Sequence, residues 1–336
     1  MNFELVLGIE TSCDETAASV VLEGTKVLSN IISSQIDTHR VYGGVVPEIA
    51  SRKHIESISF VVGEAFRQAG IEKEDVGAIA ATCGPGLAGA LIVGLSFAKA
   101  LSFGLKKPMI GVNHIEGHIA ANFLEDPTLE PPFVCLVASG GHTHLLLAKS
   151  MGEYEVLGRT RDDAAGEAYD KTARALGLPY PGGHAIDALA PTGNPDAVPL
   201  PKAEVSGAPL DFSFSGLKSA ALNYINKCRM TGAPLVVADV AASFQKAATE
   251  VLTEKAVGAC VKLGADKLAL AGGVASNTAL RASMKKACEK RKIKLYMPRP
   301  LYCTDNAAMI ASCGYFQLQQ GKISTLDLNA NPDLAI

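Results

Sequence analysis

The 336-residue chain has no large excess of positive or negative charge, no C-x-x-C motif and no basic leader at its start. A net charge of −3 excludes a global basic field for nucleic acid, so any contact with RNA has to come from a local patch or a partner. The eight cysteines form no C-x-x-C pair, which favours small buried thiols over disulfides or zinc ligands. The most apolar segment, Leu87 to Leu105, contains Lys99 and several Gly and Ser residues. We therefore expect a buried helix there, no membrane partner, and a soluble, cytoplasmic protein.

The length and composition predict an α/β chain in two lobes. With 48% hydrophobic and 19% charged residues, the chain can bury a large core around its sheets. A strand-like hairpin over residues 5–22, with a polar turn between two apolar runs, recurs over residues 133–148. Glu130-Pro131-Pro132 marks a boundary between the two halves. The repeat indicates a duplicated fold with one hairpin in each lobe.

The polar turns of these hairpins allow two interpretations. Residues 10–16 include Glu10 and Asp14, and such a turn can offer N–H groups to phosphate and acids to a metal, although a solvated turn needs no function. In the second turn, three residues let the backbone approach a phosphate closely: Ser139, Gly140 and Gly141. His142 and His144 alternate with apolar residues and either bind a ligand or face solvent.

Two histidines four residues apart, His114 and His118, follow an apolar run and an asparagine that can cap a helix. On a helix, both side chains lie on one face, within reach of a single metal ion. A zincin has a glutamate directly after its first histidine, whereas Glu116 is rotated by roughly 200° from His114 and points away. Asp305, at an expected helix start, either is a plain N-cap or completes a two-His, one-carboxylate set with open coordination positions. Ordinary core or surface histidines are the alternative to a metal site.

Two glycine-rich loops follow strand-like runs. Residues 84–89 match G-x-G-x-x-G in letters, but Pro85 lies inside the loop and no acid follows about 20 residues on. A tight turn with close helix packing, or a lining for another ligand, is therefore expected there, and not a dinucleotide site. Residues 272–277 open a helix directly after a strand, which is how a doubly wound fold receives a nucleotide. The basic cluster over residues 285–294 is by default a solvated helix face, with contact to RNA as the alternative.

Together these residues closely resemble the family of tRNA threonylcarbamoyladenosine-forming transferases, formerly called O-sialoglycoprotein endopeptidases. The resemblance runs from residues 8–16 to residues 304–306, and its most diagnostic part is Lys99 through Ile119. It implies a two-lobed fold similar to actin, sugar kinases and Hsp70, with duplicated ribonuclease H-like domains and the ligand in the interlobe cleft. We expect an N-terminal lobe over residues 1–130, a C-terminal lobe over 131–304, and a helix over 305–325 that packs back on the first.

The activity implied by the resemblance is transfer of a threonylcarbamoyl group from its adenylate to N6 of the adenosine adjoining the anticodon, at position 37. The tRNAs are those that read codons beginning with A, and AMP is released. By the same match, the metal ligands are His114, His118 and Asp305, with Fe2+ in several members and Zn2+ or Mg2+ as alternatives. The residues implied to line the adenylate site are Val137, Ala138, Ser139, Gly140, Gly141, Asp170, Gly183, Asp187 and Asn277. Because the donor is a mixed anhydride, no enzymic nucleophile is needed, and the candidates for accepting the proton of the amine are Glu10, Asp14 or a histidine of the 142–144 turn.

The resemblance also implies several partners: tRNA, threonylcarbamoyl-adenylate, a degenerate paralogous subunit, a small ATPase subunit and an upstream synthase that makes the adenylate. The chain lacks tryptophan, and residues 329–334 lack the Arg-Pro-Arg-Trp pattern of some bacterial members, which leaves the C-terminal docking contacts undefined. A metal-dependent glycoprotein endopeptidase and an ATPase of the actin-like fold are the competing hypotheses. The position of Glu116 argues against the first, and a His-His-Asp set has no task in the second.

Overall fold

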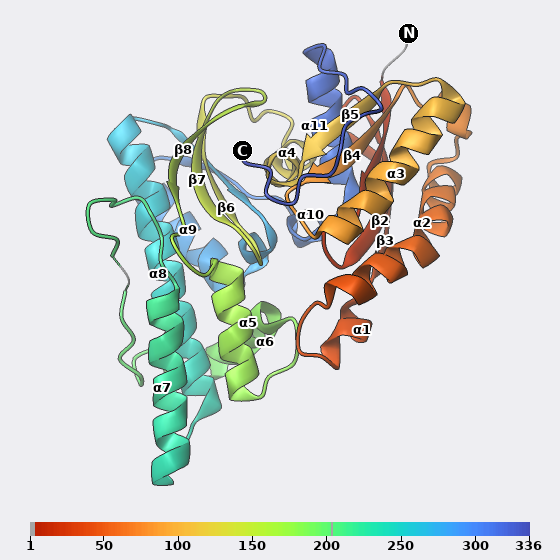
Figure 1. Ribbon diagram of the computed structural model, residues 1–336. Helices are drawn as coiled ribbons and strands as arrows, with labels where there is room; N and C mark the ends of the chain where they lie inside the picture. Colours follow the sequence, from red (N-terminus) through yellow and green to blue (C-terminus); the bar gives the residue numbers. More distant parts are fainter. Residues whose placement is uncertain (1–3, 203) are drawn as a thin grey trace. The chain divides into compact units, whose positions relative to one another are not determined.

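The computed structural model describes residues 4–202 and 204–336, which form two compact units (Figure 1). The first unit contains the described residues up to Glu130, the short segment Ser150–Glu153 and the C-terminal segment Pro298–Ile336. The second unit contains Pro131–Lys149 and Tyr154–Met297. The chain therefore returns to the first unit at Pro298, a few residues before the boundary expected at residue 304.

A five-stranded sheet with the order β3-β2-β1-β4-β5 forms the centre of the first unit. The β1–β2 and β2–β3 pairs are antiparallel, whereas the β1–β4 and β4–β5 pairs are parallel. The predicted first hairpin is thus present, and a third strand extends it. The strands are β1 (Leu5–Glu10), β2 (Glu15–Leu22), β3 (Lys26–Ser34), β4 (Ala78–Gly84) and β5 (Met109–Asn113).

Helices cover both faces of this sheet. Successive side chains of β1 point to opposite faces, and from Val6 to Glu10 every residue is buried, so each face has to be covered. Leu7 and Ile9 belong to a buried apolar cluster with residues of α2 and α3, which pack side by side (Figure 1). Gly8 faces the other way and lies against α11. The helices of this unit are α1 (Ile36–Arg40), α2 (Pro47–Ala69), α3 (Ala88–Leu105), α4 (His114–Glu125), α10 (Pro300–Cys303) and α11 (Ala307–Gln319), with the 3-10 turn η1 (Lys73–Asp75).

Helix α3 is the one helix of the described residues that is long and apolar enough, by length and composition, to cross a membrane. It packs on β4 and α2 in the first unit, but only 33% of its apolar window is buried. The expectation of a buried helix therefore holds for one face only. Its other face exposes the large apolar side chains of Ile92 and Phe103. Helix α2 likewise exposes Ile55 and Phe60.

The loop before α3 is a tight turn with close packing, as predicted. A Cβ on Gly86 would lie 2.6 Å from the carbonyl oxygen of Ser12, and one on Gly89 would lie 2.4 Å from Oγ of Ser51. Real Cβ atoms do not approach other atoms so closely, so glycine is required for this part of the chain to pack against the β1–β2 turn and α2.

The second unit repeats this plan with a five-stranded sheet in the order β10-β9-β6-β7-β8. The β6–β7 pair is antiparallel, and the β6–β9 and β9–β10 pairs are parallel, as in the corresponding positions of the first sheet. The predicted duplication of the hairpin is therefore confirmed, and it extends to the whole sheet. The strands are β6 (Phe133–Ala138), β7 (Thr143–Ser150), β8 (Glu153–Arg159), β9 (Lys267–Ala271) and β10 (Lys294–Tyr296).

The long helix α8 packs on β6 and β9 of this second sheet and also contacts α6, α7 and α9. Its span agrees with an uninterrupted run of helix-compatible residues that ends at Gly264, a glycine in the left-handed conformation. The helical elements of the second unit are α5 (Ala165–Leu176), α6 (Gly182–Leu189), η2 (Ala190–Thr192), α7 (Ser215–Thr231), α8 (Val237–Leu263), η3 (Gly273–Ser276) and α9 (Thr278–Arg291).

Candidate metal centre

The two histidines are positioned by the start of α4. The side chain of Asn113 accepts a hydrogen bond from the backbone N–H of Ile115 at 2.8 Å, so Asn113 is the N-cap that the sequence predicted. His114 is therefore the first residue of the helix, and His118 follows one turn later on the same face. Their rings meet edge to face with centroids 4.5 Å apart.

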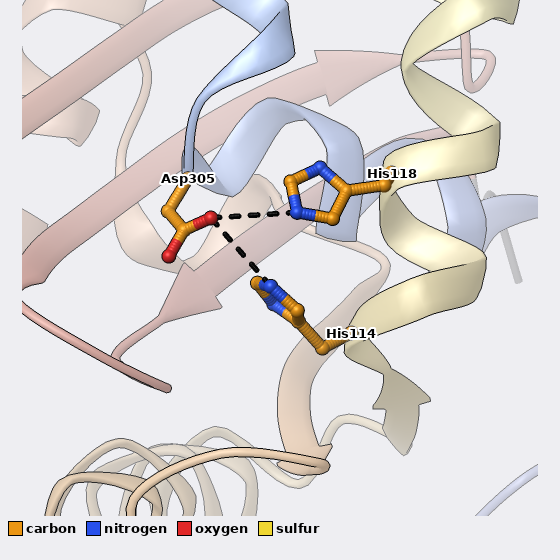
Figure 2. Close-up of side chains that lie close together, drawn as sticks. All are labelled: His114, His118 and Asp305. Atoms are coloured by element: carbon orange, nitrogen blue, oxygen red, sulfur yellow. Dashed lines mark ion pairs between the residues drawn. The ribbon is translucent and has the colours of Figure 1, made fainter. Parts of the chain in front are cut away.

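Asp305 faces both histidines from the segment before α11 (Figure 2). Its Oδ1 atom lies 3.5 Å from Nε2 of His114 and 3.4 Å from Nε2 of His118. The candidate ligand atoms of the three residues lie within 4.8 Å of one another. Two ligands bound about 2.1 Å from a tetrahedral ion lie roughly 3.4 Å apart, so this spacing fits one metal ion.

The alternative in which Asp305 is an N-cap is wrong. The cap of α11 is Asn306, whose side-chain oxygen accepts a hydrogen bond from the backbone N–H of Met309 at 3.0 Å. The carboxylate one residue earlier is directed at the histidines instead (Figure 2).

His118 supplies the observation that tests whether a metal fits. Its side chain is completely buried, and within the described part of the chain Nδ1 has no hydrogen-bond partner and Nε2 has only the Asp305 carboxylate at 3.4 Å, without hydrogen-bond geometry. A buried polar atom without a partner is costly, and such atoms in native proteins commonly belong to a site for a ligand or ion. An imidazole nitrogen aimed at a carboxylate and a second imidazole is suited to a transition metal ion. The three residues therefore fit a metal.

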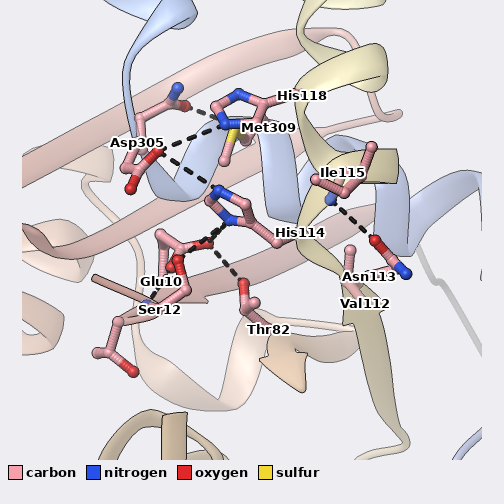
Figure 3. Close-up of polar contacts among 12 residues, drawn as sticks. Glu10, Ser12, Thr82, Val112, Asn113, His114, Ile115, His118, Asp305 and Met309 are labelled. Carbon is pink, nitrogen blue, oxygen red and sulfur yellow. Dashed lines mark hydrogen bonds and ion pairs between the residues drawn. The ribbon is translucent and has the colours of Figure 1, made fainter. Parts of the chain in front are cut away.

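Behind the histidines, Glu10 at the end of β1 holds His114 (Figure 3). The Glu10 carboxylate is fully buried and accepts hydrogen bonds from Oγ1 of Thr82 at 2.6 Å and from Nδ1 of His114 at 3.1 Å. It also accepts a short hydrogen bond from the backbone N–H of Ser12, whose hydroxyl lies 3.1 Å from the same Nδ1. With the proton on Nδ1, the lone pair of Nε2 points to the side where Asp305 lies.

The charges of this cluster shift one another. Burial lowers the pKa of His114, but the carboxylates of Asp305 and Glu10 outweigh it and raise that pKa to about 9. Burial and the neighbouring His114 lower the pKa of His118, which keeps that ring neutral. Burial raises the pKa of Glu10, yet His114 and the hydrogen bonds lower it overall, so Glu10 stays ionised. Without a metal, one charged and one neutral imidazole thus share two carboxylates, and His114 has to give up its Nε2 proton before that nitrogen can bind an ion.

Asp14 lies in the β1–β2 turn and is largely buried. Burial and the Asp305 carboxylate raise its pKa. The turn is held by His54 of α2, whose Nε2 lies 3.0 Å from the carbonyl oxygen of Cys13 and whose Nδ1 lies 2.8 Å from Oγ1 of Thr16. The sequence analysis did not identify His54, although its spacing of four residues from Ala50 and Ile58 places it on the buried face of α2.

Glu116 points away from the histidines, as predicted. Its carboxylate accepts a hydrogen bond at 2.8 Å from the side chain of Gln317 on α11. Burial raises its pKa. A carboxylate held there is not beside the candidate metal position, so this site has no zincin-like general base on α4.

The residues expected to line an adenylate site all lie in the second unit. Val137 and Ala138 end β6 and are buried, and the following turn is closed by a hydrogen bond from the backbone N–H of Ser139 to the carbonyl oxygen of His142 at 2.8 Å. Gly140 and Gly141 lie in that turn, and a Cβ on either would meet no atom within 4 Å. The backbone of this turn is therefore accessible, as a phosphate-binding turn requires.

The three polar candidates of the second unit also support its loops. Oδ1 of Asp170 accepts hydrogen bonds from the backbone N–H groups of Gly182 and Gly183 at 2.7 and 3.3 Å. Asp187 accepts hydrogen bonds from the backbone N–H and the hydroxyl of Thr278, both at 2.9 Å. Asn277 is the N-cap of α9 and donates a hydrogen bond to Gln245 at 2.8 Å. The structure thus brings Asp170 to Gly183, and Asp187 to the helix start that Asn277 caps.

The duplicated sheets and the metal-ligand set define an α/β protein of the actin, sugar kinase and Hsp70 class with a candidate metal centre in its first unit. Two solved structures have this fold. HypF of T. kodakarensis has a TM-score of 0.64 at 16% identity over 98% of this chain and 50% of its own. Component A of the Acidaminococcus fermentans (R)-2-hydroxyglutaryl-CoA dehydratase has a TM-score of 0.55 at 14% identity over 94% of this chain and 99% of its own.

Sequence relatives are more specific. The model of the tRNA N6-adenosine threonylcarbamoyltransferase family matches residues 26–312. The tRNA N6-adenosine threonylcarbamoyltransferase of Clostridium perfringens (strain SM101 / Type A) is 60% identical over 336 residues, which cover 100% of this chain and 99% of that protein. The chain belongs to the tRNA N6-adenosine threonylcarbamoyltransferase family. It is a transferase that modifies tRNA, and its substrates are tRNA and a threonylcarbamoyl-adenylate.

Proposed function

We propose that the chain transfers the threonylcarbamoyl group of its adenylate to N6 of adenosine 37 in tRNAs reading codons that begin with A. In this step the N6 nitrogen attacks the carbamoyl carbon, the bond from that carbon to the phosphate oxygen breaks, AMP leaves and the amine loses a proton. The leaving group is already activated, so the protein has to position the two substrates and stabilise the developing charge. The observation that supports this use of the site is the His114–His118–Asp305 set, since a bound metal ion would stabilise negative charge on a substrate oxygen.

The metal we propose is Fe2+, held by His114, His118 and Asp305. Two imidazoles and one carboxylate suit iron and leave positions open, although Zn2+ accepts the same donors. Glu10, with three donors on its carboxylate, acts as a positioning residue for His114 in this proposal. Asp14, with its raised pKa, is then the better candidate for receiving a proton.

For the adenylate we propose the turn Ser139–Gly141 with Val137 and Ala138 as a phosphate and base site, completed by Asp170, Gly183, Asp187 and Asn277. The open backbone of Gly140 and Gly141 supports the first part. The start of α9 at Asn277 supports the second, because helix N-termini favour anions.

We also propose that the chain works in the cytoplasm with a degenerate paralogous subunit and a small ATPase, downstream of a synthase that makes the adenylate. The exposed apolar side chains of Ile55, Phe60, Ile92 and Phe103 support a protein partner on α2 and α3. A global net charge of −3 is consistent with shared binding of tRNA.

The test supplies threonylcarbamoyl-adenylate labelled in its threonine, unmodified tRNA and the partner proteins. Wild type is compared with His114→Ala and Asp305→Ala, and with Glu116→Gln as a control on the same helix as His114. We expect label in tRNA with wild type and Glu116→Gln, and a loss of at least about 100-fold in the two ligand variants. Equal transfer by all four proteins would refute the metal site. Peptide cleavage that depends on Glu116, without labelled tRNA, would refute the transferase assignment.

A further inference from the structure

The end of α9 and the start of β10 hold the densest charge in the chain. Residues 281–294 contain seven basic side chains and a single acid, Glu289, in a protein whose net charge is −3. We call the basic patch the five of these cations that are exposed and form no ion pair within residues 4–202 and 204–336: Lys285, Lys286, Lys290, Arg291 and Lys292.

The basic patch lies on the exposed face of α9 and at the C-terminal end of that helix. Leu280, Met284 and Cys288 form the buried side of α9, so residues on the opposite side face solvent. Lys286 and Lys290 are one turn apart on that exposed side, where like charges repel each other.

The helix dipole explains only part of this arrangement. Cations in a last turn are stabilised by the negative end of a helix, which accounts for Lys290 and Arg291. Lys285 and Lys286 lie more than a turn from the end and gain little from it, because the effect falls off within the last turn. Glu289 is the single acid near them, four residues after Lys285 and three after Lys286, and no ion pair of 4.0 Å or less joins it to either within the described residues. Positive charge stays in excess on this face, so a polyanion is the partner that the charge fits.

The sheet edge continues the same charge. Lys294 at the start of β10 lies opposite Lys267 at the start of β9, and its ammonium lies 4.5 Å from the centroid of the Tyr296 ring. The cations therefore follow one rim of the second unit, from α9 to the beginning of its two parallel strands.

We propose that the basic patch binds the sugar–phosphate backbone of tRNA. The proposal rests on the family function, in which tRNA is the substrate. Phosphate contacts supply most of the salt-dependent affinity for nucleic acid, and a protein of negative net charge has to concentrate them in a patch. Arginine and lysine side chains on an exposed helix face suit this task, because they can contact phosphate oxygens without contacting the bases.

The test measures binding of the full-length chain to fluorescent unmodified tRNA over a salt series. The variant is Lys286→Gln/Lys290→Gln, and the matched control with equal loss of charge is Lys26→Gln/Lys227→Gln, at two exposed lysines outside the patch. We expect the patch variant to bind about tenfold more weakly at low salt and to reduce the slope of log K against log salt by roughly 1.4 to 1.8. The control and Lys286→Arg/Lys290→Arg should bind like wild type, and circular dichroism reports whether each variant folds.

Unchanged affinity and slope in the patch variant would overturn the proposal, as would equal losses in the patch variant and the control. Loss of binding to vesicles containing phosphatidylserine, with tRNA binding intact, would assign the patch to lipid and overturn it too. In the transfer assay the patch variant should raise KM for tRNA and keep kcat. If wild type binds tRNA through the patch but transfers no label, the proposed function fails while the patch assignment stands.

Discussion

The substitution Glu10→Gln tests how the metal-binding face of His114 is fixed. Glutamine has the size of glutamate but one acceptor oxygen where the carboxylate has two. The carboxylate receives three donors, from Ser12, Thr82 and His114. At least one of them therefore loses its acceptor, and the amide NH2 group faces a donor. Thr82 and His114 share Oε2, and an amide oxygen in that place is uncharged and accepts from Nδ1 more weakly than a carboxylate does. The tautomer of His114 with its proton on Nε2, which blocks the metal position, therefore becomes more populated.

We expect Glu10→Gln to weaken metal binding about 10- to 100-fold, which corresponds to about 1.4–2.7 kcal/mol. The metal-free variant should also lose about 1–3 kcal/mol of stability, because a buried donor is left unsatisfied. The assay titrates the metal-free protein with Zn2+, and with Fe2+ under anaerobic conditions, against a chromogenic chelator. Urea denaturation without metal measures the stability separately.

Thr82→Val is the control for general loosening of the site. It removes one donor to Glu10 but leaves the hydrogen bond from His114 in place. We expect a similar loss of stability with little change in metal affinity. The reasoning fails if Glu10→Gln binds both ions as tightly as wild type, or if Thr82→Val loses as much affinity as Glu10→Gln.

Two further predictions concern stability, one from close packing in the first unit and one from a partly buried ion pair in the second. Gly8→Ala should lower the free energy of unfolding by about 1–3 kcal/mol in urea, because its Cβ would lie 2.2 Å from the carbonyl oxygen of Ala307. Gly63→Ala, which meets no atom within 4 Å, should not destabilise α2, and equal losses in the two variants would contradict the packing argument. At Asp163, burial raises the pKa but Lys218 and Lys171 lower it overall, so its stabilising effect should be lost as the pH falls below 3.8. Denaturation curves of Asp163→Asn should lack this acid-dependent loss, and a variant that retains it would show that other carboxylates cause it.

The sequence predicts the metal helix well because its rules are local. Asn113 caps α4, His114 and His118 share a face, and Glu116 points away, and each statement depends only on residues within one or two turns. The duplicated hairpins follow from a repeated pattern of apolar runs and polar turns in the same way. Asp305 is different, since no spacing relates it to the histidines. The residues alone left it open between a plain N-cap and a third ligand, and the family resemblance favoured the ligand.

The residues around the ligands could not be predicted because tertiary packing brings them together. Glu10 ends β1 and Thr82 lies in β4, and Thr82 can donate to the carboxylate that holds His114 because β1 and β4 are parallel neighbours in the sheet. In the second unit, Asp187 and Asn277 were expected from the resemblance to bind substrate, but their hydrogen bonds hold the start of α9. A polar residue at a helix start gives the same sequence pattern whether it caps the helix, binds substrate or does both. The pattern alone therefore does not distinguish the structural role from the binding role.

An asparagine N-cap next to a ligand occurs on both sides of the candidate metal centre. Asn113 caps the helix that begins with His114, and Asn306 caps the helix that follows Asp305. In each case a neutral amide satisfies the first turn, so the adjacent imidazole or carboxylate is not needed as a cap and can face the ion. The two helices then pack closely, since a Cβ on Gly117 would lie 2.6 Å from the side chain of Ile310. The separation of the ligands is therefore set by two helix starts and one close helix contact, and a change at any of the three should move Asp305 relative to the histidines.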